Sequence, residues 1–134
     1  MNGGYDWQRF VDVVRSAKQG KPLHYQWYDW HTDALAGFID EPARPLVIIE
    51  GVRLVQPSIT DYVDLSIWID CLLEEAAQRG IERDRRNKDW EPAALDEHIR
   101  KWHQVWIPKD RAFAEAFSPR GAADMLYSEP LSAS

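Results

Sequence analysis

Four consecutive apolar residues, at positions 46–49, are followed by Glu50 and Gly51. An apolar run without alternation is typical of a strand buried on both faces, as in a parallel sheet covered by helices. Glu50 then falls at the carboxyl end of the predicted strand, where open α/β sheets bind ligands, and Gly51 permits a sharp turn. A carboxylate there can hold Mg²⁺ near a nucleotide phosphate. The alternative is a strand that stops where polarity begins, with Glu50 merely solvated.

Apolar residues recur at helical spacing from Trp7 to Ala17 and predict an N-terminal helix. Asp6 is its expected N-cap, and Gly20 suits the position just beyond its end. Residues 23–28 have the aromatic composition of a strand. We expect this short extended segment to lead into a functional loop.

The rest of the chain alternates predicted strands and helices. A long helix with Asp89 as its cap should kink or break at Pro108, which lacks an N–H and clashes with the preceding turn. The other predicted elements are a helical turn near Pro57, a strand at residues 65–70, a helix at 72–86, a loop at 118–121, a strand at 123–127 and a frayed tail at 128–134.

This alternation predicts an α/β protein with a small parallel sheet, arranged as three α/β/α layers in a single domain over residues 1–134. Right-handed crossovers would place the two acidic strand ends, Glu50 and Asp70, at the same edge of the sheet.

Composition and charge narrow the functional class. With 45% hydrophobic and 28% charged residues, the 134-residue chain is globular. A net charge of −6 argues against general nucleic-acid binding, which requires a basic face. One cysteine excludes an internal disulfide, and neither a signal peptide nor a membrane span is visible. We therefore expect a cytoplasmic protein with no nucleic-acid or membrane partner.

Three other sets of residues suggest structural roles. Cys71 precedes two leucines and is expected to be buried rather than nucleophilic. His98 and His103 are five residues apart and would not share a helical face, so we expect no metal pair. Three tryptophans at helical spacing are expected in the core or at an interface, namely Trp90, Trp102 and Trp106.

Arg79 and Arg83 are four residues apart, so on a helix their guanidinium groups project from one face. Paired guanidinium groups suit phosphate oxygens, which they can bind through two hydrogen bonds each. The alternative is a solvated helix on which Glu75 pairs with Arg79 and Glu82 pairs with Arg86.

Taken in order, these motifs resemble the uridine kinase-like branch of the P-loop kinases, over about residues 3–127. The matching segments are Tyr5-Asp6-Trp7, Tyr28-Asp29-Trp30, Ile49-Glu50-Gly51-Val52, residues 63–70, Arg79-Gly80-Ile81-Glu82-Arg83-Asp84 and Ala123-Asp124.

The resemblance implies ATP-dependent phosphoryl transfer to a hydroxyl of a nucleoside or similar small molecule, with ATP and Mg²⁺ as cofactors. By position it implies an acceptor site, a Mg²⁺ acid and a phosphate lid. The residues so assigned are Asp6, Tyr28, Asp29, Trp30 and His31 for the acceptor, Glu50 for Mg²⁺, and Arg79 and Arg83 for the lid. Asp6 as a helix cap only, and Tyr28 and Trp30 as core aromatic residues, are the alternatives.

The chain departs from the family pattern at the nucleotide site. No glycine-rich loop ending in Gly-Lys-Ser/Thr occurs in the sequence, although the backbone of such a loop cradles the phosphates. No residue takes the role of the family's catalytic Asp. We therefore expect a truncated kinase relative without the N-terminal strands, inactive in isolation. The alternative is a non-catalytic binding or assembly module, completed by a partner strand or by self-association, because apolar sheet edges invite pairing.

Overall fold

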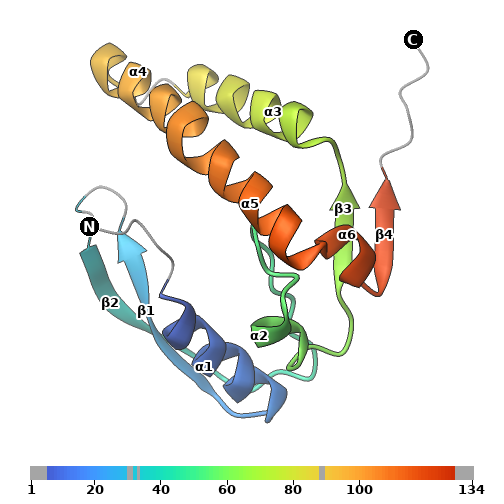
Figure 1. The fold of residues 1–134 in the computed structure, drawn as a ribbon. Coiled ribbons are helices and arrows are strands. Elements are labelled where there is room, and N and C mark those ends of the chain that lie inside the picture. The colour runs from blue at the N-terminus through green and yellow to red at the C-terminus, as the bar shows by residue number, and fades with distance from the viewer. Residues whose placement is uncertain (1–5, 30–31, 33, 88–89, 129–134) are drawn as a thin grey trace. The chain divides into compact units, whose positions relative to one another are not determined.

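The computed structural model describes residues 6–29, 32, 34–87 and 90–128 (Figure 1). The chain divides into two compact units, Met1–Asp64 and Leu65–Ser134, and each is described by itself. Helices and small sheets are mixed along the chain, which confirms the predicted α/β class. The single domain over residues 1–134 stays a prediction.

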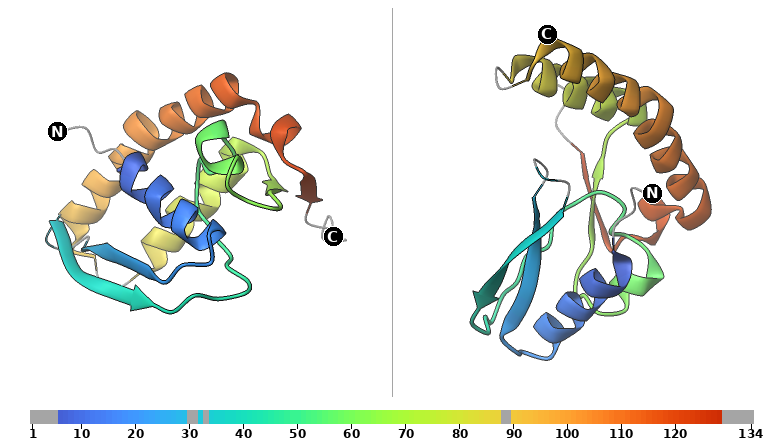
Figure 2. Two further views of the ribbon diagram at one scale, coloured as in Figure 1. Left: turned by 90° about the horizontal axis from the view of Figure 1, so that it is seen from below. Right: turned by 90° about the vertical axis from the view of Figure 1, so that its left-hand side faces the viewer.

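The first unit combines helix α1 (Trp7–Lys18) with an antiparallel hairpin of β1 (Leu23–Asp29) and β2 (Ala34–Glu41). Figures 1 and 2 show α1 lying beside the hairpin. The short helix α2 (Pro57–Thr60) also contacts α1 and begins at the predicted proline. The buried apolar residues of this unit are Val14, Val55 and Ile59.

The predicted ends of α1 are confirmed. The Asp6 carboxylate accepts a hydrogen bond from the backbone N–H of Arg9 at 3.2 Å, which is an N-cap. At the other end Gly20 has φ +65°, and its N–H donates to the carbonyl of Ala17 at 2.9 Å. The next N–H, of Lys21, donates to Ser16 at 3.0 Å, so the carbonyl groups of the last turn are satisfied by a Schellman motif.

Residues 46–49 form no strand, and the prediction of a buried parallel strand there is wrong. Leu46 is 75% exposed and Ile48 is 83% exposed. A strand buried on both faces needs neighbouring strands for its backbone and packed layers for its side chains, and an apolar run supplies only the propensity. With no strand ending at Glu50, the predicted common sheet edge for Glu50 and Asp70 is wrong as well.

The second unit contains a small parallel sheet of β3 (Ile67–Asp70) and β4 (Met125–Ser128). Both strands were predicted, and they are hydrogen-bonded to each other in parallel. Just before the ladder, the Asp124 carboxylate accepts hydrogen bonds from the N–H and the hydroxyl of Ser66 at 2.8 and 2.6 Å. Together with the hydrogen bond from the Met125 N–H to the Ser66 carbonyl at 3.1 Å, this contact links the two chain segments just before the paired strands begin.

Helix α3 (Leu73–Arg86) follows β3, as predicted. A second helical stretch consists of α4 (Pro92–Lys101), the π-helical turn η1 (Trp102–Trp106) and α5 (Ile107–Phe117). Figure 1 shows α4 running alongside α3. The short helix α6 (Pro119–Ala122) replaces the loop predicted there and leads to β4.

The predicted break at Pro108 is replaced by a change of helical register. The N–H of Ile107 donates to the carbonyl of Trp102, five residues back, which closes the π-helical turn. Pro108 then lies in the first turn of α5, where a missing N–H costs little. The helical path therefore continues across the proline, and its irregularity falls in the preceding turn.

Three further expectations concern single residues or the chain ends. Cys71 was expected to be buried rather than nucleophilic, and the structure shows it only partly buried. The Asp89 cap and the tail at residues 129–134 lie outside the described residues, and Ser128 is the last residue of β4 rather than part of a frayed tail. Within the described ranges, no helix has both the length and the apolar character needed to cross a membrane.

Candidate functional site

A cavity of about 900 Å³, wide open to solvent, lies at the carboxyl ends of β3 and β4 in the second unit. It is bounded by the last residues of both strands, the start of α3, the end of α5 and α6. Its apolar walls include Trp68 and Leu73, and its charged side chains include Asp70, Arg79 and Arg120. Carboxyl ends of parallel strands are where open α/β sheets bind ligands, so this cavity is the best candidate for a ligand site in the second unit.

Arg79 is the predicted lid residue that lines this cavity. Its Nη2 donates a hydrogen bond to Glu75 at 2.7 Å, and Glu75 lines the same cavity. Arg86 Nη2 lies 3.6 Å from Glu82 Oε2, so both ion pairs of the solvated-helix alternative are present. Exposed pairs of this kind contribute roughly 0.3–0.5 kcal/mol each to stability.

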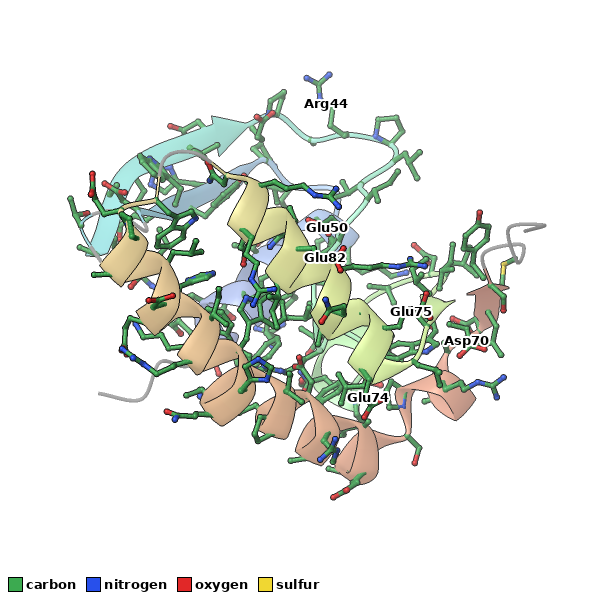
Figure 3. The ribbon with its side chains drawn as sticks, turned by 90° about the horizontal axis from the view of Figure 1, so that it is seen from above. Arg44, Glu50, Asp70, Glu74, Glu75 and Glu82 are labelled. Carbon is green, nitrogen blue, oxygen red and sulfur yellow. The ribbon has the colours of Figure 1, made fainter. Side chains whose placement is uncertain are left out.

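Asp70 ends β3 and is bound by a residue that the sequence analysis did not single out. Arg120 of α6 donates from Nε and Nη2 to the two carboxylate oxygens of Asp70, at 3.0 and 3.1 Å. This forked contact raises the pKa of the Arg120 guanidinium, which stays charged. Figure 3 shows Asp70 close to the first turn of α3, from which Glu75 projects. Nothing in the local pattern around Arg120 indicates this pairing, because the partners are 50 residues apart.

The second predicted lid arginine, Arg83, contacts a buried carboxylate. Its Nε and Nη2 donate to Oδ1 of Asp84 at 3.0 and 2.9 Å. The other oxygen, Oδ2, accepts from His98 Nε2 at 2.8 Å and from Trp102 Nε1 at 2.9 Å. Asp84 is one of two buried polar residues identified in the described part of the chain, the other being Ser66.

Burial raises the pKa of the Asp84 carboxyl, but hydrogen bonds from Trp102, His98 and Arg83 outweigh that effect and bring the pKa below its usual value. Asp84 is therefore ionised at neutral pH. The sequence contained a signal for this cluster: Gly80 and Asp84 are four residues apart on α3, and His98 and Trp102 are four apart across from them.

The predicted acceptor residues belong to the first unit. Asp6 caps α1, and Arg9, which it contacts, also donates to Gln26 of β1 at 3.0 Å. Tyr28 and Asp29 are the last residues of β1, with Tyr28 on the surface and Asp29 half-buried. Because they are consecutive residues of a strand, the side chains of Tyr28 and Asp29 point to opposite faces of β1. Asp6 is linked to the middle of that strand through Arg9. Trp30 and His31, also predicted for the acceptor site, lie outside the described residues.

Glu50, the predicted Mg²⁺ acid, is exposed in the connection between β2 and α2 (Figure 3). In the described residues no group of three or more His, Cys, Asp or Glu side chains is arranged to hold a metal ion. Mg²⁺ in kinases is bound by one or two carboxylates together with substrate phosphates, so Glu50 could act only jointly with a nucleotide.

Comparison with known proteins places these features in a family context. The model of the phosphoribulokinase / uridine kinase family matches residues 3–103. A uridine kinase of Haemophilus ducreyi is 25% identical over 130 residues, which cover 92% of this chain and 59% of that protein. A uridine kinase of Shewanella frigidimarina is 24% identical over 135 residues, covering 96% and 63%.

A third relative has a different name. The inorganic pyrophosphatase TTM1 of Arabidopsis thaliana is 22% identical over 112 residues, which cover 82% of this chain but only 17% of that protein. The chain thus spans about three fifths of the length of the two uridine kinases and a small part of TTM1.

Proposed function

Because the chain belongs to the phosphoribulokinase / uridine kinase family of P-loop kinases, we propose that it forms the acceptor and lid portion of an ATP-dependent small-molecule kinase. The phosphoryl acceptor is a hydroxyl of a nucleoside-like ligand. ATP and Mg²⁺ are the cofactors that the family relatives imply. In phosphoryl transfer the protein contributes mainly positioning and charge stabilisation, and the residues of this chain fit those two tasks.

The observation that carries the proposal is the cavity at the carboxyl ends of β3 and β4, with Arg79 in its wall. Its volume of about 900 Å³ is large enough for a nucleotide-sized ligand. Apolar walls with a few charged groups suit a ligand that has both a planar base and phosphates. Arg79 lies one helical turn from Arg83, so α3 offers two guanidinium groups to a phosphate chain.

The acceptor is proposed to bind at the first unit, where the family match includes Asp6, Tyr28 and Asp29. Trp30 and His31 follow them in the sequence and belong to the same proposed site. An aromatic ring can stack on a base, and carboxylates accept hydrogen bonds from ribose hydroxyl groups. Glu50 is the carboxylate proposed for Mg²⁺.

Turnover is proposed to need a phosphate-binding loop, which these 134 residues do not contain. We therefore expect the chain in isolation to bind ligands without transferring phosphate. Titration calorimetry of the full 134-residue chain with Mg²⁺–ATP and with uridine tests this expectation. Binding of either ligand supports the proposal, and absence of both would overturn it. Phosphorylation of uridine by the pure chain would contradict the expected inactivity.

The matched pair of variants for this experiment is Arg79→Gln and Arg85→Gln. Both substitutions remove one positive charge from α3, but only Arg79 lines the cavity. Loss of a charge-assisted contact should weaken Mg²⁺–ATP binding roughly tenfold in Arg79→Gln. The Arg85→Gln variant should bind as the unmodified chain does. Equal weakening in both would show that net charge, and not the cavity, governs binding.

A second candidate function is assembly, with a second copy of the chain as the partner. It is favoured by the exposure of Leu46 and Ile48 in a segment that has strong β-propensity but belongs to no described strand. The segment would pair as a strand with its counterpart in the other copy. Sedimentation velocity over a range of concentrations tests this candidate: a dimer that is lost in Ile48→Lys supports it, and a monomer at all concentrations contradicts it.

A further inference from the structure

The buried carboxylate of Asp84 is shared between three residues from two packed helical segments. Its Oδ2 binds His98 of α4 and Trp102 of the π-helical turn, while its Oδ1 binds the neighbouring Arg83. Because an ionised carboxylate can only accept hydrogen bonds, all of these groups act as donors, and His98 carries its proton on Nε2. The charge of Asp84 is thus fully satisfied inside the unit.

The packing around Asp84 leaves it little freedom to move. One turn before it, a Cβ added to Gly80 would lie 2.5 Å from Cη2 of Trp102, so α3 and the π-helical turn approach closely. The His98 ring contacts two indole rings, with centroid distances of 4.4 Å to Trp90 and 5.0 Å to Trp106. Both donors to Oδ2 are therefore held in place by their neighbours.

The contact with Arg83 has a defined geometry and an exposed side. The Arg83 side chain is 75% exposed, whereas Asp84, which it binds through two donors, is buried. A guanidinium group has five N–H donors in a rigid plane, so about three remain directed away from Asp84. The remaining donors are available to an anion. Arg79, in contrast, is held by Glu75, whose side chain is 50% exposed and therefore less constrained.

We propose that Asp84 is a positioning residue for phosphate recognition: it is anchored by His98 and Trp102 and holds the guanidinium of Arg83 ready for a polyphosphate. The inference rests on the proposed function, because it assumes that α3 binds phosphate. An arginine fixed before binding loses less side-chain entropy when a ligand arrives, so the complex is tighter. The acidic residue thus promotes the binding of an anion through its neighbour.

The test measures the affinity of the full 134-residue chain for tripolyphosphate by calorimetry, with Asp84→Asn and Glu82→Gln as matched variants. Both substitutions remove one negative charge from α3. Simple electrostatics predicts tighter anion binding in both. Positioning predicts that Asp84→Asn binds roughly tenfold more weakly while Glu82→Gln does not weaken. Tighter or unchanged binding by Asp84→Asn would overturn the inference.

A double-mutant cycle shows whether Asp84 acts through Arg83. If it does, Asp84→Asn should have little further effect in a chain that already carries Arg83→Gln. The indole N–H resonance of Trp102 reports whether the variants keep the packed cluster. If Asp84→Asn weakens binding just as much in the Arg83→Gln background, the carboxylate acts by another route. That result would overturn the inference.

Arg83→Lys covers the case in which Asp84→Asn does not fold, because Arg83 is exposed. Lysine keeps the charge but lacks the planar fork, so roughly tenfold weaker binding is expected, whereas a point-charge role predicts no change. Wild-type affinity in this variant would overturn the inference but would leave the proposed function standing. Absence of tripolyphosphate and Mg²⁺–ATP binding by the unmodified chain would overturn the proposed function and this inference with it.

Discussion

Two regions of the molecule reverse the usual relation between polarity and burial. Asp84 carries a charge and is 8% exposed, whereas the aliphatic Ile48 is 83% exposed. The difference lies in the partners that each region has. Asp84 faces a histidine and an indole on a packed helical segment, and four hydrogen bonds satisfy it. Ile48 lies in a segment that belongs to no described helix or strand, and its side chain faces solvent.

This comparison shows that burial follows the available partners and not the side chain alone. A buried carboxylate is stable only while its donors are present, and removal of either side leaves polar groups unpaired. An exposed apolar residue, in contrast, contributes little to the folded state until another surface covers it. Each region therefore predicts the sign and the size of the effect of its own mutations.

At the buried acid, the largest effect is expected from Asp84→Ala. The substitution leaves the Trp102 and His98 donors without their carboxylate, and unsatisfied buried groups cost roughly 1–3 kcal/mol each. We expect the free energy of unfolding, measured by urea denaturation, to fall by about 3 kcal/mol. The control is Glu82→Ala on the same helix, which breaks an exposed pair and should cost less than about 0.5 kcal/mol. Similar losses in the two variants would show that Asp84 is not anchored as described.

A somewhat smaller effect is expected from Gly80→Ala. The added methyl group would lie 2.5 and 2.7 Å from two carbons of the Trp102 ring, and overpacking of this kind costs about 1–3 kcal/mol. The matched control is Gly121→Ala, since a Cβ there meets nothing within 4 Å. Urea denaturation should show a loss for the first variant only. Introduction of Trp102→Leu should remove most of the cost of Gly80→Ala, and a cost that stays the same would exclude this contact as its cause.

The stability of the protein is expected to depend on pH through Asp124, another carboxylate that accepts hydrogen bonds within the fold. Hydrogen bonds from the side chain and the backbone of Ser66 lower the pKa of its carboxyl below the ordinary value of 3.8. A group whose pKa is lower in the folded state stabilises the protein above its unfolded pKa. That contribution is lost as the pH falls below about 3.8 towards the folded pKa. The stability difference between the unmodified chain and Ser66→Ala should therefore shrink between pH 5 and pH 3, as followed by urea midpoints. A constant difference would contradict the assignment.

The helices could be predicted because their signals are local. The Asp6 cap, the Gly20 end and the proline at the start of α2 each act within one or two helical turns. The sequence also predicted β1, β3 and β4 from their composition. The error at residues 46–49 arose because a strand depends on a neighbour, and no local pattern shows whether that neighbour exists.

The candidate site was predictable only where residues act within one helix. The spacing of Arg79 and Arg83 predicted that both project from one helix. The structure shows that they differ: Arg79 lines the cavity, whereas Arg83 donates hydrogen bonds to the buried Asp84. Arg120 was missed because its partner lies 50 residues away. The motif at residues 79–84 assigns no role to Asp84, although its spacing from Gly80 matches that of the facing His98 and Trp102.

The smallest effect is expected at the exposed end of the comparison. Ile48→Ser should change the free energy of unfolding by less than about 0.5 kcal/mol, because the side chain already meets solvent. The matched substitution Ile59→Ser, at a position 2% exposed in the same unit, should cost about 2–5 kcal/mol through loss of packing. Urea denaturation at low and high protein concentration measures both. A large loss in Ile48→Ser at high concentration alone would mean that a second copy covers this segment. A large loss at every concentration would mean that the segment is packed within the chain, and the contrast with Asp84 would no longer hold.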